Sequence, residues 1–102
     1  MKPVVLAAGV AASVLVASAY AQEELAKKHN CFACHAVDKK VVGPSYKDVA
    51  AKYRNDAQAE AKLFEKVKKG GSGVWGPVPM PPNSQVPDGD IKKLVSWILS
   101  LK

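Results

Sequence analysis

The sequence has few residues that could form sulfur or nitrogen sites, and this scarcity excludes several kinds of protein. It has only two cysteines, Cys31 and Cys34, and two histidines. A disulfide between cysteines so close together would close a very small loop and would restrain the unfolded chain little. A structural zinc site needs four ligands, and no second cysteine pair or pair of closely spaced histidines follows.

Long apolar runs are also scarce, since only one segment approaches the length that spans a bilayer. A short basic start and an uncharged apolar run occupy residues 1–17, and Ala19-Tyr20-Ala21 is a small-x-small tripeptide. This layout predicts a secretory signal peptide, residues 1–21, cleaved after Ala21 to leave a mature domain of residues 22–102. An uncleaved anchor is the alternative, because the run is close to the roughly 20 residues that cross a bilayer. No later run is comparable, so we expect a soluble periplasmic protein.

Sustained alternation of apolar and polar residues is absent, which favours an all-α domain. Short helices are expected at Leu25–Asn30, directly before Cys31, at Tyr46–Arg54 with Ser45 as N-cap, and at Ala57–Lys69. Gly70 is expected to end the third of these helices.

The clearest amphipathic pattern lies at the C-terminus. One face carries apolar residues at helical spacing, with Asp88 or Asp90 expected as N-cap. These residues are Ile91, Leu94, Val95, Ile98 and Leu101. Between the last two helices, Gly70–Pro87 is a long loop rich in glycine and proline. Structureless loops of this length are uncommon and are usually functional, and the prolines restrict this one before folding.

One contiguous motif carries chemistry, Cys31-Phe32-Ala33-Cys34-His35, a C-x-x-C-H attachment signal for haem c. Residues three apart on a helical turn point to the same side, so both thiols can reach the vinyl groups of one haem. His35 then becomes the proximal iron ligand. A redox dithiol of the thioredoxin type is the alternative, but it expects a βαβ context that this chain lacks. A domain of this size usually needs a staple, and haem would supply it.

The second axial ligand is predicted to be Met80, the only methionine after Met1. It lies among prolines in the most restricted part of the long loop rather than on a helix face, where a methionine would more often fill a core. His29 is the other candidate. It lies too close to the attachment site to reach the opposite face of the ring, so we expect an exposed surface histidine.

Together these residues resemble the small bacterial class I cytochromes c of the cytochrome c-551/c-552 group. The resemblance covers residues 23–102 and is carried by His35, by Val42-Gly43-Pro44-Ser45-Tyr46-Lys47-Asp48-Val49-Ala50, by the segment from Gly73 to Asn83, and by Trp97-Ile98-Leu99-Ser100. It implies the class I cytochrome c fold, about four short helices around one covalently bound haem c, with a Met-bearing loop.

The resemblance also implies roles for residues around the haem. Pro44 would present its carbonyl to the His35 imidazole, and Trp75 would donate its indole N–H to a haem propionate. Asn83 would orient or polarise the Met80 sulfur. Lys66 stands where some members have an arginine near the propionates, and a lysine cannot make the same bidentate contact.

With both axial positions filled, no coordination site is open to a substrate. We therefore expect a non-enzymatic one-electron carrier that cycles between Fe(III) and Fe(II). The resemblance suggests nitrite reductase, cytochrome oxidase or cytochrome c peroxidase as acceptors. The alternative is a haem-based ligand sensor or weak peroxidase, which requires Met80 to leave the iron.

The charge is basic, +6 for the whole chain, and removal of Lys2 with the signal leaves 14 basic and 9 acidic residues, or +5. The simplest interpretation is a solvated surface. Our hypothesis is that lysines near the haem edge steer docking on acidic faces of redox partners. Nucleic-acid binding is not expected of an exported chain with so few aromatic residues, and we expect a monomer.

Overall fold

The structure is a computed structural model that describes residues 20–102. The predicted signal peptide lies outside the described residues except for its last two positions. Residues 20–28 are helical, followed by a 3-10 turn η1 (Cys31–Ala33), α2 (Tyr46–Tyr53), α3 (Ala59–Lys69) and α4 (Asp88–Ser100). The described part of the chain has no strand, only two isolated bridges. The all-α prediction is therefore confirmed.

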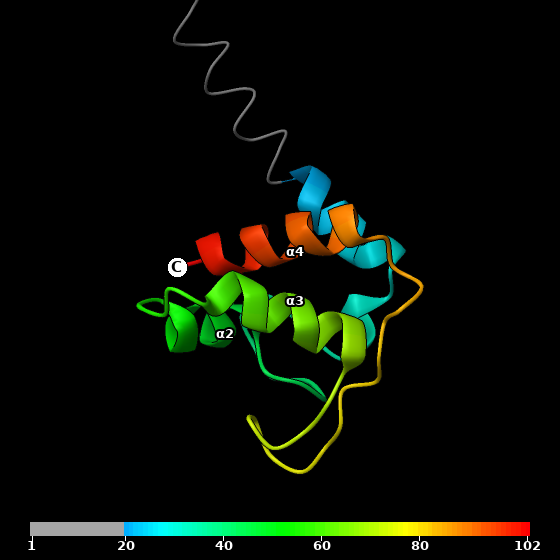
Figure 1. Cartoon of the computed structure of the whole chain (residues 1–102). Helices are drawn as coiled ribbons and strands as arrows, with labels where there is room; N and C mark the ends of the chain where they lie inside the picture. Colours follow the sequence, from blue (N-terminus) through cyan, green and yellow to red (C-terminus); the bar gives the residue numbers. More distant parts are fainter. Residues whose placement is uncertain (1–19) are drawn as a thin grey trace, which may run out of the picture.

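The C-terminal helix is the centre of the fold, because α4 packs against both α2 and α3 (Figure 1). Its buried residues are Ile91, Leu94, Val95 and Ile98, and they lie on the face that the sequence pattern predicts. They join Tyr46, Val49, Leu63 and Val86 in the buried interior. The irregular segment between η1 and α2 and the first part of the loop between α3 and α4 lie together away from α4, at the bottom of Figure 1.

Local sequence signals explain the ends of the middle helices. Ser45 begins α2, and its hydroxyl accepts a hydrogen bond from the Asp48 backbone N–H at 3.1 Å, as predicted for an N-cap. Helix α3 begins two residues later than expected, because the Asp56 carboxylate and carbonyl accept bonds from the N–H groups of Gln58 and Ala59 and hold a turn there. Gly70 ends α3 with φ +71°, as expected.

Two predictions about helix ends are wrong. Neither Asp88 nor Asp90 caps α4: Pro87 holds the N-cap position, and the two carboxylates contact Lys68 and His29 instead. The first helix does not run directly into Cys31, because Asn30 adopts a left-handed conformation with φ 62°. Asparagine tolerates this conformation, which turns the chain before the motif.

No helix among residues 20–102 is both long enough and apolar enough to cross a membrane.

Candidate functional site

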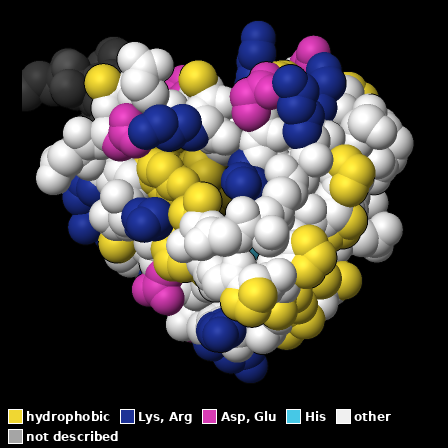
Figure 2. All heavy atoms as spheres, turned by 60° about the horizontal axis from the view of Figure 1, so that its bottom comes forward, with side chains coloured by type: hydrophobic (Ala, Val, Ile, Leu, Met, Phe, Trp, Pro, Cys, Tyr) yellow, Lys and Arg dark blue, Asp and Glu magenta, His cyan; other side chains and the backbone are white. Residues whose placement is uncertain are grey.

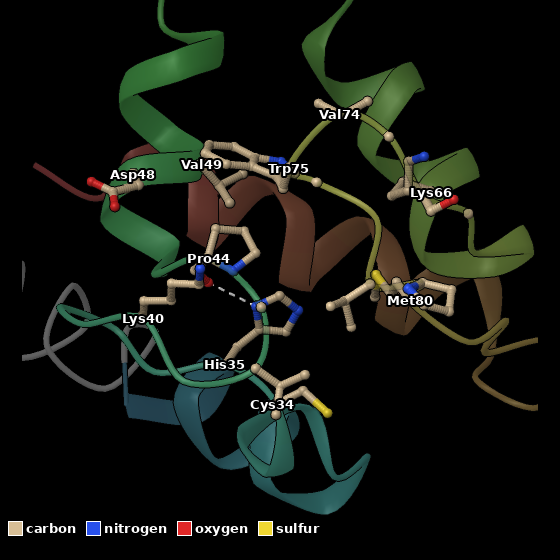
Figure 3. Close-up of a pocket in the computed structure, with 18 of the residues that line it drawn as sticks. Cys34, His35, Lys40, Pro44, Asp48, Val49, Lys66, Val74, Trp75 and Met80 are labelled. Carbon is tan, nitrogen blue, oxygen red and sulfur yellow. Dashed lines mark hydrogen bonds between the residues drawn. The ribbon is translucent and has the colours of Figure 1, made fainter.

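A pocket of about 300 Å³ opens between the segment after Cys34 and the loop after α3. Its floor is apolar, formed by Val49, Leu63 and Ile98 from the three long helices. His35 and Met80 come from opposite walls, as Figure 3 shows. The folded chain therefore brings together two candidate ligands that lie far apart in the sequence.

The C-x-x-C-H motif forms a tight turn at the edge of this pocket. The Cys34 and His35 N–H groups both donate to the Cys31 carbonyl, at 3.2 and 3.0 Å. Cys31 and Cys34 are half-buried free thiols. Burial raises the pKa of the Cys31 thiol, and a hydrogen bond with the Tyr46 hydroxyl lowers it in part.

His35 is held by the chain that follows it. Its Nδ1 lies 2.8 Å from the Pro44 carbonyl oxygen, and because a carbonyl only accepts, Nδ1 carries the proton. In this tautomer the lone pair lies on Nε2, the atom left for a metal. Gly43 lies so close that a Cβ there would be 2.5 Å from His35 Cε1. Only glycine fits at this position.

The backbone of Met80 is held by hydrogen bonds to the start of the same loop. Gly71 and Met80 exchange two backbone hydrogen bonds, at 3.0 and 2.8 Å. Gly70 packs under the same segment, where an added Cβ would lie 2.4 Å from the Met80 carbonyl oxygen. Met80 is thus held at the pocket by backbone contacts that are independent of its side chain.

Of the other residues predicted to lie near the haem, Trp75 and Lys66 lie at the pocket and Asn83 bonds to the backbone. Trp75 and Lys66 line the pocket, and Trp75 is 44% exposed. The Asn83 amide Nδ2 donates to the carbonyls of Val67 and Pro81, at 3.2 and 3.1 Å. The first bond ties the loop to the end of α3 and the second lies within the loop, so the predicted role of Asn83 toward the Met80 sulfur stays a prediction.

His29 is not the exposed histidine that we expected. Its side chain is only 13% exposed, and Nε2 lies 3.1 Å from the Asp90 carboxylate on α4. The reason is tertiary packing, because the first helical segment lies against the start of α4 (Figure 1).

The residues present fit a haem. The Cys34 thiol lines the pocket and the free thiol of Cys31 lies in the same turn of chain, while one wall offers an imidazole and the other a thioether sulfur. Thiolates, histidine and methionine are the ligand and attachment groups of haem c. The apolar floor suits a porphyrin face, and Lys66 and Trp75 could receive its carboxylates.

Sequence reasoning missed three residues at this site. Tyr46 stacks on the His35 ring, Gly43 gives that ring room, and Lys52 places its ammonium 5.5 Å from the Trp75 ring centre. The sequence places Tyr46 at the start of a predicted helix, which is correct but does not show its contact with His35. No local pattern signals the contacts of Gly43 and Lys52, because both depend on how the chain folds back.

Comparisons with known proteins agree with this geometry. Residues 21–102 match the family described as Cytochrome c. The chain is 56% identical to cytochrome c-552 of Nitrosomonas europaea, over 90% of this chain and 91% of that protein. It is 50% identical to cytochrome c-551 of Pseudomonas aeruginosa over the full length of both.

A solved structure supports the same assignment. The crystal structure of wild-type Nitrosomonas europaea cytochrome c552 superposes with a TM-score of 0.76 at 57% identity, covering 78% of this chain and 99% of that one. The expected class I cytochrome c fold is confirmed. The chain belongs to the cytochrome c family and carries one covalently bound haem c.

Proposed function

We propose that this monohaem electron carrier holds its haem through thioethers at Cys31 and Cys34, with His35 and Met80 as axial ligands. Each thioether forms when a thiol S–H adds across a vinyl C=C bond. The haem supplies reversible Fe(III)/Fe(II) chemistry. The observation that carries the proposal is the placement of His35 and Met80 on opposite walls of a pocket that Cys34, the second cysteine of the motif, also lines.

The chain's own residues would keep the iron environment constant during electron transfer. The Pro44 carbonyl holds the His35 proton on Nδ1, and the Gly71 bonds hold the backbone of Met80. A site fixed in both oxidation states needs little reorganisation when an electron arrives. The same fixation favours the carrier over the ligand sensor or weak peroxidase, because Met80 would have to leave the iron against its anchored backbone.

A Met80→Ala variant tests the ligand set, with redox titration followed by optical spectra of the holoprotein. The expected result is loss of the sulfur-to-iron band of the ferric protein, a lower midpoint potential and uptake of CO. Val78→Ala is the matched control, since Val78 lies in the same loop and is 62% exposed. An unchanged spectrum in Met80→Ala would remove Met80 from the ligand set.

We further propose that partners dock at the open edge of the pocket. Val42, Val74, Trp75 and Val78 line it and are each exposed by 44% or more. Figure 2, which brings this end of the molecule forward, shows hydrophobic side chains gathered there with basic side chains around them. Lys40 and Lys66 also line the pocket. An acidic partner face would be attracted by these lysines and would then bury the apolar edge.

The dependence of the electron-transfer rate on ionic strength tests this docking. Rates with an acidic redox partner should fall as salt rises, since exposed charges are screened. Lys40→Gln should weaken that dependence more than Lys92→Gln, because Lys92 lies on α4 and does not line the pocket. Rates independent of salt would refute the steering.

Export with cleavage after Ala21 remains part of the proposal. The mass of the protein isolated from the periplasm tests it: a chain beginning at Gln22 is expected, and a retained residue 1–21 segment would indicate an anchor instead.

A further inference from the structure

The ring of His35 is constrained more tightly than one hydrogen bond requires. The bond from Nδ1 to the Pro44 carbonyl limits rotation of the ring, but carbonyl oxygens accept over a broad range of directions. The ring of Tyr46 lies parallel to it, with centroids 5.0 Å apart and planes inclined by 24°. Gly43 lies beside Cε1, where any other residue would place a Cβ 2.5 Å from that atom, so only glycine leaves the ring in its observed position.

Tyr46 is itself buried and packed on several sides, so its ring offers a defined surface for His35. It is 5% exposed and is the first residue of α2, where its N–H donates to the Ala36 carbonyl at 2.9 Å. Trp97 of α4 packs edge-on against the Tyr46 ring at 5.6 Å, and Phe32 of the motif lies 6.0 Å away. Trp97 and Phe32 thus pack against the Tyr46 ring from two separate elements, while the bond to Ala36 holds its backbone.

From this arrangement we infer that Tyr46 is a positioning residue, which sets the plane of the His35 imidazole by stacking on it. The inference rests on the proposed ligand role of His35. With Nδ1 bonded to Pro44 and one face covered by Tyr46, the lone pair of Nε2 has a single direction, into the pocket. The aromatic ring of Tyr46, rather than its hydroxyl, orients the imidazole.

The orientation of the ring plane is measurable in the ferric holoprotein. It governs which iron orbital holds the unpaired electron, and therefore the order and spread of the paramagnetically shifted haem methyl signals in NMR and the g-values in EPR. A residue that only fills the core would change stability without changing these spectra.

Two substitutions at Tyr46 separate its ring from its hydroxyl. Tyr46→Phe keeps the ring and should retain the wild-type methyl pattern and g-values. Tyr46→Leu removes the ring and should reorder the methyl signals and shift the g-values. Tyr53→Leu is the matched control, because Tyr53 is a partly buried aromatic residue on the same helix that packs on the core. It should lower the melting temperature and leave the spectra unchanged.

Two outcomes would overturn the inference. One is a folded Tyr46→Leu protein with the wild-type pattern, and the other is a Tyr46→Phe protein altered as much as Tyr46→Leu, which would assign the effect to the hydroxyl.

If Tyr46→Leu does not fold, Gly43→Ala provides a second test, at the Cε1 end of the ring. Its added Cβ should push the imidazole and alter the methyl pattern, and an unchanged pattern would show that the ring plane is not held by packing. Failure of the underlying ligand assignment would look different. In that case the wild-type protein itself would lack strongly shifted His35 ring signals.

Discussion

The His29 imidazole and the Asp90 carboxylate form a hydrogen bond across 61 residues of sequence, with Nε2 and Oδ2 3.1 Å apart. The pair joins the end of the first helical segment to the first turn of α4, and both side chains are mostly shielded from water, with 13% and 25% exposed. A pair in this setting contributes more than the exposed pairs elsewhere on the surface.

Replacement of His29 by alanine should therefore destabilise the protein by about 1–3 kcal/mol, because it leaves the half-buried Asp90 carboxylate without its partner. Denaturant unfolding measures the change. Lys27→Ala is the control, since the Lys27–Glu24 pair is more than half exposed and should cost less than about 0.5 kcal/mol. Equal losses in the two variants would contradict the importance of the His29 pair.

Substitution of Gly70 should disturb both stability and the Met80 position. Its φ of +71° with ψ of −163° is a conformation essentially restricted to glycine, and an added Cβ would meet the Met80 carbonyl at 2.4 Å. Gly70→Ala should cost about 2–3 kcal/mol and weaken the sulfur-to-iron band. Unfolding curves and ferric spectra measure the two effects.

Gly89→Ala is the matched control for Gly70. Gly89 lies in the first turn of α4, and nothing is within 4 Å of an added Cβ. It should gain about 0.5 kcal/mol, because alanine is the better helix former. The same spectral change in both variants would show that the contact of Gly70 with Met80 does not matter.

Acid should weaken the ion pair that Asp56 makes. A 2.7 Å hydrogen bond from Lys62 holds the pKa of Asp56 below its ordinary value of 3.8, and raises the pKa of Lys62 above 10.5. Because the carboxyl pKa is lower in the folded state, the contribution is present above the ordinary pKa and is lost as the pH falls through the lowered value. It persists up to the alkaline range, where Lys62 loses its proton.

The urea midpoint at neutral and at strongly acidic pH measures this linkage. Asp56→Asn should narrow the difference between the two midpoints, and Asp38→Asn, an exposed acid elsewhere, should not. Identical acid sensitivity in the wild type and Asp56→Asn would contradict the prediction.

Loss of the haem should remove much of the folded structure. A Cys31→Ala, Cys34→Ala double variant leaves the apolar floor of a 300 Å³ pocket against water in a domain with a small core. We expect a large loss of helical circular dichroism relative to the wild-type holoprotein. Equal ellipticity would show that the chain folds without its cofactor.

Much of the fold could be predicted because its signals are local. Ser45 lies immediately before an apolar pattern, and the spacing from Ile91 to Ile98 marks the buried face of α4. The predicted N-cap of α4 was wrong. Aspartate is a good N-cap, but in the folded protein the carboxylates of Asp88 and Asp90 contact Lys68 and His29. Competition from distant residues is not visible in a local pattern.

In the candidate site, too, the residues that a local motif contains could be predicted and those that depend on tertiary contacts could not. Cys31, Cys34 and His35 lie within one motif of five residues that predicts haem attachment, and Met80 is the only methionine among the prolines of the long loop. Tyr46 and Gly43 could not be assigned to His35 from the sequence, because a stack and a close approach exist only after the chain folds back on the motif.

The two backbone hydrogen bonds between Gly71 and Met80 also separate the exposed part of the loop from the part that holds Met80. These bonds close residues 72–79 into a smaller loop. Its exposed residues include Val74, Trp75 and Val78. Because the closure uses backbone atoms alone, side chains at the tip can be exchanged while Met80 keeps its place. If partners dock at this tip and Met80 binds the iron, as proposed, substitutions at the tip should alter partner preference without altering the coordination of the iron.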